Sequence, residues 1–249
     1  MVGMKTIGLI GGMSWHSTVE YYRILNELVA ERRGGHASAK VALQSLDFAE
    51  IRECQLADDW ERAGRLLAEA ARRCEQSGAD LVLIGTNLMH RVAEDVQAAV
   101  DIPLLHIADA IADAAHERGW QQLGVLGTRW VMEEDFYVGR LARRGLHVVV
   151  PDDADRTEAD RVIFDELTQG LVRDDSRASY AAILGRLQDA GAEAVVLGCT
   201  EIELLVRPED APLPVIASLR THAEAAVAVA LGDRGLGDRV LGERVLSGA

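Results

Sequence analysis

The segment GADLVLIGT, residues 78–86, recurs 113 positions later as GAEAVVLGC, residues 191–199. Each copy is a short apolar run that ends in a glycine and a small polar or thiol residue. Two further pairs of matching segments follow in the same order: IGLIG (7–11) with LGVLG (123–127), and IPLL (102–105) with LPVI (213–216). Internal repetition of this kind predicts two related lobes.

Runs rich in leucine or β-branched residues alternate with longer stretches of helical period, which is typical of βαβ units around a parallel sheet. The predicted strands are 6–10, 41–46, 81–84, 104–107, 123–126, 147–150, 194–197 and 215–217. The predicted helices include 17–33, 59–76 and 176–189. In the first helix we expect Ser17 and Thr18 to form the cap. Its buried face is expected to contain Val19, Tyr22, Leu25, Leu28 and Val29.

The fold class that follows is α/β. We expect two pseudo-symmetric lobes, each a parallel β-sheet flanked by helices, with an active-site cleft between them. Residues 1–108 together with 214–231 are assigned to the first lobe, and 109–213 to the second. The glycine-rich tail, 232–249, is expected to be a mobile C-terminal extension because frequent glycine disfavours an isolated helix.

The composition and charge of the chain disfavour some classes of binding partner. A chain of 249 residues with 49% hydrophobic positions can bury a sizeable core. A formal charge of −14 disfavours nucleic-acid and membrane partners. No apolar run approaches the ~20 residues that span a bilayer, and no secretion signal opens the chain, so we expect a cytoplasmic protein. Three widely spaced cysteines indicate neither a disulfide framework nor a metal site.

Small polar residues follow four of the predicted strands, where parallel sheets bind their ligands. They are Met13 and Ser14, Thr86 and Asn87, Thr128, and Cys199 and Thr200. If the lobes face each other, Thr86 and Cys199 occupy equivalent positions and place one proton-handling side chain on each face of a substrate. A helix N-terminus after the strand is expected to lower the pKa of the Cys199 thiol toward neutrality. The alternative is that Cys199 is a small buried core residue.

Four motifs make the chain resemble the aspartate/glutamate racemase superfamily from about Lys5 to about Leu231. They are IGLIGGMSW (7–15), GTNLMH (85–90), GTRWVMEEDFY (127–137) and GCTEIELLV (198–206). The chain is most similar to the bacterial branch in which threonine replaces the first catalytic cysteine. The resemblance implies a two-base proton transfer at the α-carbon of an amino acid, without a cofactor, by Cys199 and Thr86. It also implies a homodimer, and contacts to the substrate from Met13, Ser14, Asn87, Thr128, Thr200 and Glu201.

Several positions depart from the family pattern. Leu88 and Val131 stand where the pattern has threonine, and Glu158 stands where acidic-substrate enzymes tend to have lysine. A carboxylate facing an acidic side chain would repel it. We therefore expect these three residues to line the substrate side chain and, with Glu50, to favour a cationic or larger apolar one. The alternative for Glu158 is a solvated residue on a helix face.

Three interpretations of the function remain open. The first is an amino-acid racemase or epimerase, an isomerase. The second is a single-thiol decarboxylase or a cis–trans isomerase on the same scaffold, which the presence of one catalytic thiol allows. The third is a catalytically inactive homologue that binds a ligand.

Overall fold

A computed structural model describes residues 3–207, 211–233 and 240–241. The chain divides into two compact units. Unit 1 contains the described residues up to Gly85, Val92–His106 and those from Ala223 onward, and unit 2 contains Thr86–Arg91 and Ile107–His222. Thr86–Arg91 and residues 214–222 lie in the ranges expected for the first lobe, but both segments group with unit 2. Most of the tail expected to be mobile lies outside the described residues.

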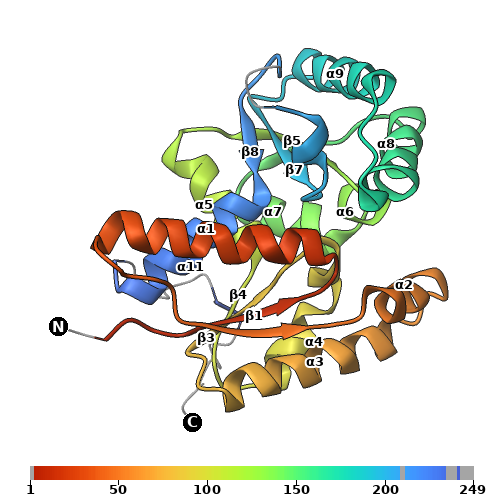
Figure 1. Ribbon diagram of the computed structural model, residues 1–249. Coiled ribbons are helices and arrows are strands. Elements are labelled where there is room, and N and C mark those ends of the chain that lie inside the picture. The colour runs from red at the N-terminus through yellow and green to blue at the C-terminus, as the bar shows by residue number, and fades with distance from the viewer. Residues whose placement is uncertain (1–2, 208–210, 234–239, 242–249) are drawn as a thin grey trace, which may run out of the picture. The chain divides into compact units, whose positions relative to one another are not determined.

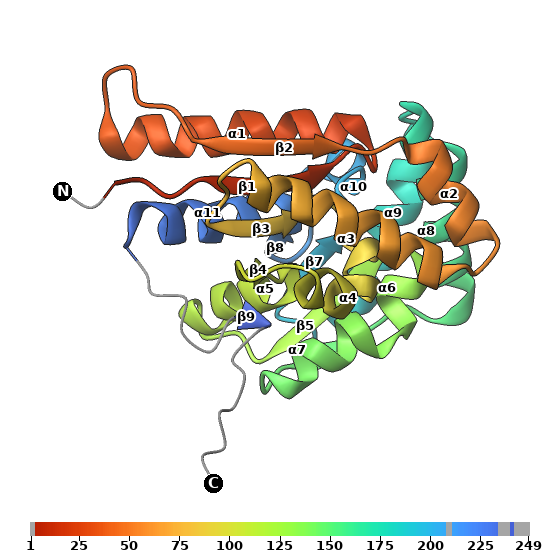
Figure 2. The ribbon, with the colours of Figure 1, turned by 90° about the horizontal axis from the view of Figure 1, so that it is seen from below.

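The sheet of unit 1 has the strand order β2-β1-β3-β4-β9. Its strands are β1 (Ile7–Gly11), β2 (Val41–Ser45), β3 (Leu81–Ile84), β4 (Leu104–Leu105) and β9 (Val240–Leu241). The first four are parallel, and β9 adds to β4 in antiparallel sense. Figure 2 shows β2, β1 and β3 side by side with their carboxyl ends at the same edge. The polar residues that follow β1 therefore lie at the edge where such sheets bind ligands.

Helices cover both faces of this sheet. Figure 1 shows α1 (Trp15–Arg33) along one face and α3 (Trp60–Gln76) along the other. The Asp59 side chain accepts the amide hydrogen of Arg62 and so caps α3. The remaining helices of this half are α2 (Phe48–Leu56), η1 (Leu88–Val92, of which only Val92 is in unit 1), α4 (Ala93–Ala98) and α11 (Ser218–Leu231), which enters unit 1 at Ala223.

Helix α1 corrects the prediction at its start. It begins at Trp15, with Ser14 in the cap position, two residues before the predicted start. Thr18 does not open the helix because its Oγ1 accepts the amide hydrogen of Gly12 (2.7 Å) and donates to the Ser14 carbonyl (2.9 Å). Val19 and Tyr22, expected in the core, are 53% and 54% exposed. Leu25, Leu28 and Val29 are buried as expected, and the helix also buries Ser17, Thr18, Tyr21 and Ile24.

The strand predicted over 104–107 is also shorter than expected. Only Leu104 and Leu105 pair, and Ile107 already begins helix α5 (Ile107–Glu117). The amide of Ile107 donates to a histidine ring, His90, rather than to a neighbouring strand. The apolar run therefore belongs partly to the buried face of a helix, which periodicity alone does not separate from a strand.

The sheet of unit 2 repeats the order of unit 1. Its strands are β5 (Gln122–Gly127), β6 (His147–Val149), β7 (Ala194–Gly198) and β8 (Val215–Ala217), in the order β6-β5-β7-β8 and all parallel. Each matching pair of sequence segments occupies the same place in its own sheet: β1 with β5, β3 with β7, and β4 with β8. The predicted α/β fold with two similar parallel sheets is confirmed.

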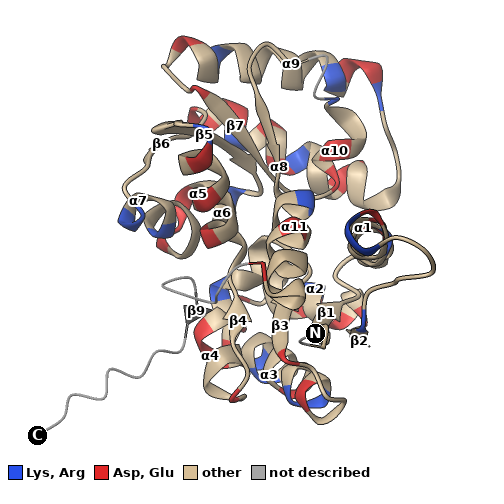
Figure 3. Ribbon diagram, turned by 90° about the vertical axis from the view of Figure 1, so that its left-hand side faces the viewer, with Lys and Arg blue, Asp and Glu red and all other residues tan. Residues whose placement is uncertain are grey.

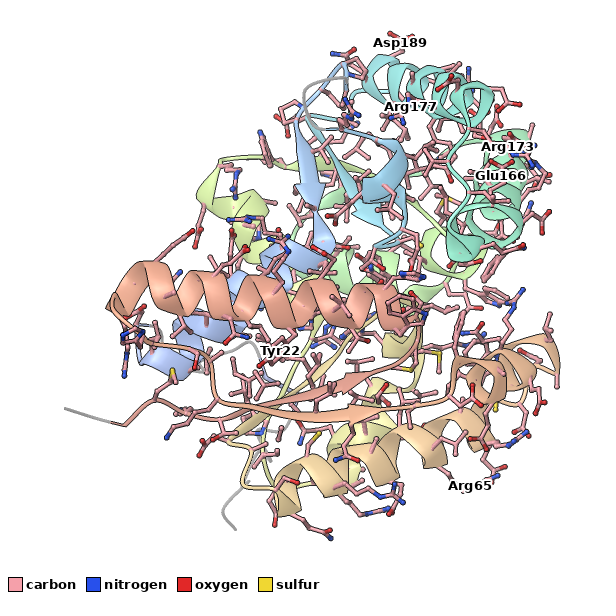
Figure 4. All side chains as sticks on the ribbon, viewed as in Figure 1. Tyr22, Arg65, Glu166, Arg173, Arg177 and Asp189 are labelled. Atoms are coloured by element: carbon pink, nitrogen blue, oxygen red, sulfur yellow. The ribbon has the colours of Figure 1, made fainter. Side chains whose placement is uncertain are left out.

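The helices of unit 2 lie on both sides of its sheet, with α8 and α9 on one side in Figure 1. They are α5, α6 (Arg129–Glu133), η2 (Asp135–Gly139), α7 (Arg140–Arg143), α8 (Asp153–Asp165), η3 (Leu167–Gln169), α9 (Asp174–Asp189) and α10 (Ile202–Leu205). Glu166, only 3% exposed, accepts from Ser176 and pairs with Arg161. Figure 4 shows Glu166 next to Arg173, its more distant partner at 4.0 Å. This buried carboxylate is thus compensated within the unit.

The apolar core of each unit is built from its strands and from the helix faces that pack on them. Leu9, Ile10 and Val125 are fully buried, and each such side chain stabilises the fold by about 1.5–3 kcal/mol. Charged residues gather on the helices, and Figure 3 shows them along α3. Among the described residues, no helix is both long and apolar enough to cross a bilayer.

Candidate active site

In unit 1, the turn after β1 holds Met13 and Ser14. Both side chains are buried, at 6% exposure each. Ser14 has the extended backbone of a helix cap, and its carbonyl accepts from Thr18. The two residues therefore lie at a strand end, next to the first turn of α1. Their contact with a substrate stays a prediction.

In unit 2, Cys199 directly follows β7 and contacts Glu201. The Sγ atom of Cys199 lies 3.2 Å from Oε2 of Glu201, and the same oxygen accepts from Oγ1 of Thr200 at 2.8 Å. Cys199 and Glu201 are both buried, at 9% and 8% exposure. Three of the predicted site residues thus form one hydrogen-bonded group.

The prediction that a helix start lowers the pKa of the Cys199 thiol is corrected by the structure. Burial and the Glu201 carboxylate raise the pKa of the thiol well above its usual range. The backbone amides of Glu201 and Ile202 lower this pKa, as a helix start is expected to do, but their effect is the smaller one. In the resting protein Cys199 is therefore a neutral thiol that donates to a carboxylate.

Thr128 and Val131 lie beyond the end of β5. Thr128 is 5% exposed, and within the described chain its Oγ1 has no hydrogen-bond partner. The amide of the next residue, Arg129, donates to the Asp160 carboxylate at 2.9 Å. Val131 is buried against the end of β7: a Cβ atom added to Gly198 would lie 2.9 Å from Cγ1 of Val131. Val131 is therefore a packing neighbour of the strand end that holds Cys199.

The segment Thr86–Arg91 is bound to unit 2 through Asn87. The side-chain amide of Asn87 donates to Oγ of Ser218 (2.9 Å), and its oxygen accepts from the hydroxyl of Tyr137 (2.8 Å). Asn87 and Leu88 are buried, whereas Thr86 is half-buried. Thr86 and Cys199, the predicted acid–base pair, thus belong to the same compact unit.

Glu158 lies on α8, where both carboxylate oxygens accept from Arg161 at 2.9 Å. Its side chain is 34% exposed, and the Arg161 hydrogen bonds lower its pKa. Glu158 and Cys199 both lie near the buried Tyr180, whose pKa is raised first by burial and then by these two groups. The Glu158 carboxylate thus already has a cationic partner in Arg161.

Sequence reasoning did not assign Tyr137 and Ser218 to the site. Tyr137 is inside a quoted motif, and Ser218 is a hydroxyl residue directly after β8. Ser218 is a small polar residue directly after a strand, which is the pattern by which Thr128 and Thr200 were selected. The pairing with Asn87 joins positions 131 residues apart, which no local pattern reveals.

The sequence of the chain matches the model of a known protein family. The model of the Asp/Glu/hydantoin racemase family matches residues 10–226. The chain belongs to this family. It is therefore an isomerase, and the resemblance noted from the motifs is confirmed.

Solved structures and a curated relative agree with this assignment. A Yersinia pestis protein, named as a candidate Asp/Glu racemase, is 45% identical with a TM-score of 0.87, covering 92% of this chain and 100% of the other. An aspartate racemase homologue from Pyrococcus horikoshii is 34% identical with a TM-score of 0.80, with the same coverage of both chains. The broad specificity amino-acid racemase RacX of Bacillus subtilis is 21% identical over 70% of this chain and 74% of its own.

Proposed function

We propose that this family member racemises an α-amino acid without a cofactor, by removing and returning the α-proton. Cys199 acts on one face of the α-carbon and Thr86 on the other. The observation that carries the proposal is the hydrogen bond from Cys199 to Glu201 at the end of β7, in a chain of the racemase family. A thiol with a carboxylate beside it has both a proton to give and a place to put one.

Glu201 is the group that makes this thiol usable as a base. Since burial disfavours the free thiolate, the proton of Cys199 moves to Glu201 as the thiolate takes the α-proton of the substrate. The Cys199–Glu201 pair then holds one proton more than at rest and is neutral, and the negative charge lies on the α-carbanion of the substrate. When Cys199 instead protonates the carbanion, the same steps run in reverse: the thiol gives its proton to the carbanion and takes one from Glu201.

Thr86 is the weaker member of the pair. A hydroxyl gives up its proton readily only if it receives another in the same step, so Thr86 passes a proton between water and the carbanion. Its half-buried position is consistent with access of water from outside. The two faces therefore differ in rate, although the equilibrium between enantiomers is unchanged.

For the substrate side chain we propose a neutral, apolar group. The side chain of Leu88 is buried and uncharged, and Val131 packs against the end of β7 and adds no charge there. Glu158 and Glu50, which favoured a cation, are already paired with Arg161 and Arg62. The carboxylates of Asp160 and Glu201 next to the strand ends disfavour an acidic side chain.

The test is a racemisation screen of the proteinogenic amino acids and ornithine, followed by chiral chromatography. Turnover of neutral apolar amino acids, abolished by Cys199→Ser, supports the proposal. Turnover of aspartate or glutamate alone contradicts the side-chain assignment. If no racemisation is detected, decarboxylation or cis–trans isomerisation of a substrate would favour the second interpretation. Tight binding without turnover would favour the third. The predicted homodimer is measured separately by light scattering.

A further inference from the structure

His90 lies four residues after Thr86 and contacts its backbone. The side chain is 2% exposed, and its Nδ1 atom lies 2.8 Å from the carbonyl oxygen of Thr86. On the other side of the ring, the amide of Ile107 donates to Nε2 at 3.2 Å. The imidazole therefore joins the residue proposed as one acid–base group to the first residue of α5, and all three residues belong to unit 2.

These two contacts fix the tautomer of the ring. A backbone amide can only donate, so Nε2 must accept and carries no hydrogen. Nδ1 then carries the hydrogen and donates to the Thr86 carbonyl. Burial, followed by the neighbouring His222 and Arg140, lowers the pKa of His90 well below its usual range, so the ring stays neutral near pH 7.

The Thr86 carbonyl needs such a partner because it stands before a short 3₁₀ segment, η1, rather than inside a long helix. The amide of Ile107 is one of the first amides of α5, which lack partners within the helix. His90 satisfies both groups with a single ring. Asn87, the next residue, is held by Ser218 and Tyr137, so the peptide group between Thr86 and Asn87 is held from both ends.

We propose that His90 is a positioning residue for Thr86: the ring holds the Thr86 carbonyl and so sets where the Thr86 hydroxyl lies relative to the α-carbon of the substrate. The inference rests on the proposed function. It assigns His90 no proton transfer of its own. Its role is geometric, and a displacement of about 1 Å at a reacting group can lower a rate by about 100-fold.

Two substitutions separate the two hydrogen bonds. The amide nitrogen of asparagine reaches the place of Nδ1, so His90→Asn keeps the donor to Thr86 and loses the acceptor for Ile107. The longer glutamine side chain reaches the place of Nε2, so His90→Gln keeps an acceptor for Ile107 and loses the donor to Thr86. Both remove the ring, so each serves as the stability control for the other.

The first readout is the isotope effect on kcat/KM with each α-deuterated enantiomer. His90→Gln is expected to lower kcat by about tenfold or more, with KM little changed, and His90→Asn is expected to stay close to wild type. Slowing the Thr86 step raises the isotope effect for the enantiomer whose proton leaves on that face and lowers it for the other. Thr86→Ser gives the reference direction, and a purely structural loss would not split the two enantiomers.

The second readout does not depend on activity. In a Thr86→Cys background, alkylation of the introduced thiol is followed peptide by peptide, and His90→Gln should change its rate constant severalfold while His90→Asn should not. Equal effects of the two His90 substitutions in both readouts overturn the inference. An inactive wild-type enzyme would contradict the proposed function instead, and the alkylation result would still decide the role of His90.

Discussion

The Sγ atom of Cys199 donates to the Oε2 atom of Glu201 across 3.2 Å, so the thiol proposed as the main acid–base group rests beside an anion. Burial and this carboxylate raise the pKa of the thiol, and two backbone amides oppose the shift without cancelling it. The resting enzyme therefore has a protonated Cys199.

Removal of the Glu201 charge is expected to lower the pKa of Cys199. In Glu201→Gln the thiolate no longer faces an anion, so thiolate formation, followed by its absorbance at 240 nm or by alkylation of the Cys199 peptide, should begin at lower pH than in wild type. Glu193→Gln is the matched control. Glu193 accepts from the backbone amides of Gln121 and Gln122 at the start of β7, whereas Cys199 follows the other end of this strand, so the control removes a carboxylate that does not contact the thiol. An unchanged or higher pKa in Glu201→Gln would contradict this account.

Replacement of Thr86 by cysteine is expected to raise turnover. A thiol is a far better base than a hydroxyl near neutral pH, so Thr86→Cys should increase kcat in both directions. Steady-state assays of both enantiomers measure the effect. Thr86→Ser, which keeps a hydroxyl, is the reference. If Thr86→Cys is no faster than wild type, Thr86 only positions substrate or water.

The buried His90 makes stability fall on the acid side of neutrality. Its pKa is depressed in the folded state, so below about pH 6.5 the unfolded chain binds a proton that the folded chain refuses. The free energy of unfolding should therefore decrease as the pH falls from 7 to 5, by at most about 1.4 kcal/mol per pH unit for this one group. Urea titrations at several pH values measure it, and His90→Asn should flatten the slope. A stability that rises over this range would refute the assignment.

Gly8 in β1 leaves no room for a side chain. A Cβ atom there would lie 2.9 Å from Cβ of Cys74 and 3.0 Å from the carbonyl oxygen of Leu81. Gly8→Ala is expected to cost about 1–3 kcal/mol of unfolding free energy, because strand and helix must separate. Gly185 in α9 faces open space, so Gly185→Ala should be neutral or stabilising by up to about 1 kcal/mol. Chemical denaturation compares the two, and equal effects would contradict the packing described.

Much of the fold was predictable because the repeated segments form equivalent strands in two similar sheets. The glycine-ended runs at 78–86 and 191–199 became β3 and β7, which occupy the same place in two sheets of the same strand order. Where tertiary contacts override local pattern, prediction failed. Thr18 turns its hydroxyl back to Gly12, which moves the start of α1 to Trp15, and Ile107 joins a helix although its neighbours read as a strand.

The grouping of Cys199, Thr200 and Glu201 was predictable from the sequence, but the electrostatics of this group were not. Cys199, Thr200 and Glu201 lie together because they follow one strand, and sequence order is enough to see that. The raised pKa of the thiol comes from burial, which spacing does not report. The contacts of Asn87 with Tyr137 and Ser218 join distant parts of the chain, so the local sequence pattern could not predict them.

Solvent hydrogen exchange tests the central claim most directly. The wild-type enzyme is incubated in deuterated water with one enantiomer of a turned-over amino acid, and both enantiomers are analysed by mass spectrometry at low conversion. Proton removal on one face and return on the other predicts one deuterium at the α-carbon of the newly formed enantiomer and almost none in the recovered substrate. A product enantiomer that forms without deuterium, or deuterium appearing equally in the recovered substrate, would contradict proton transfer by two groups on opposite faces.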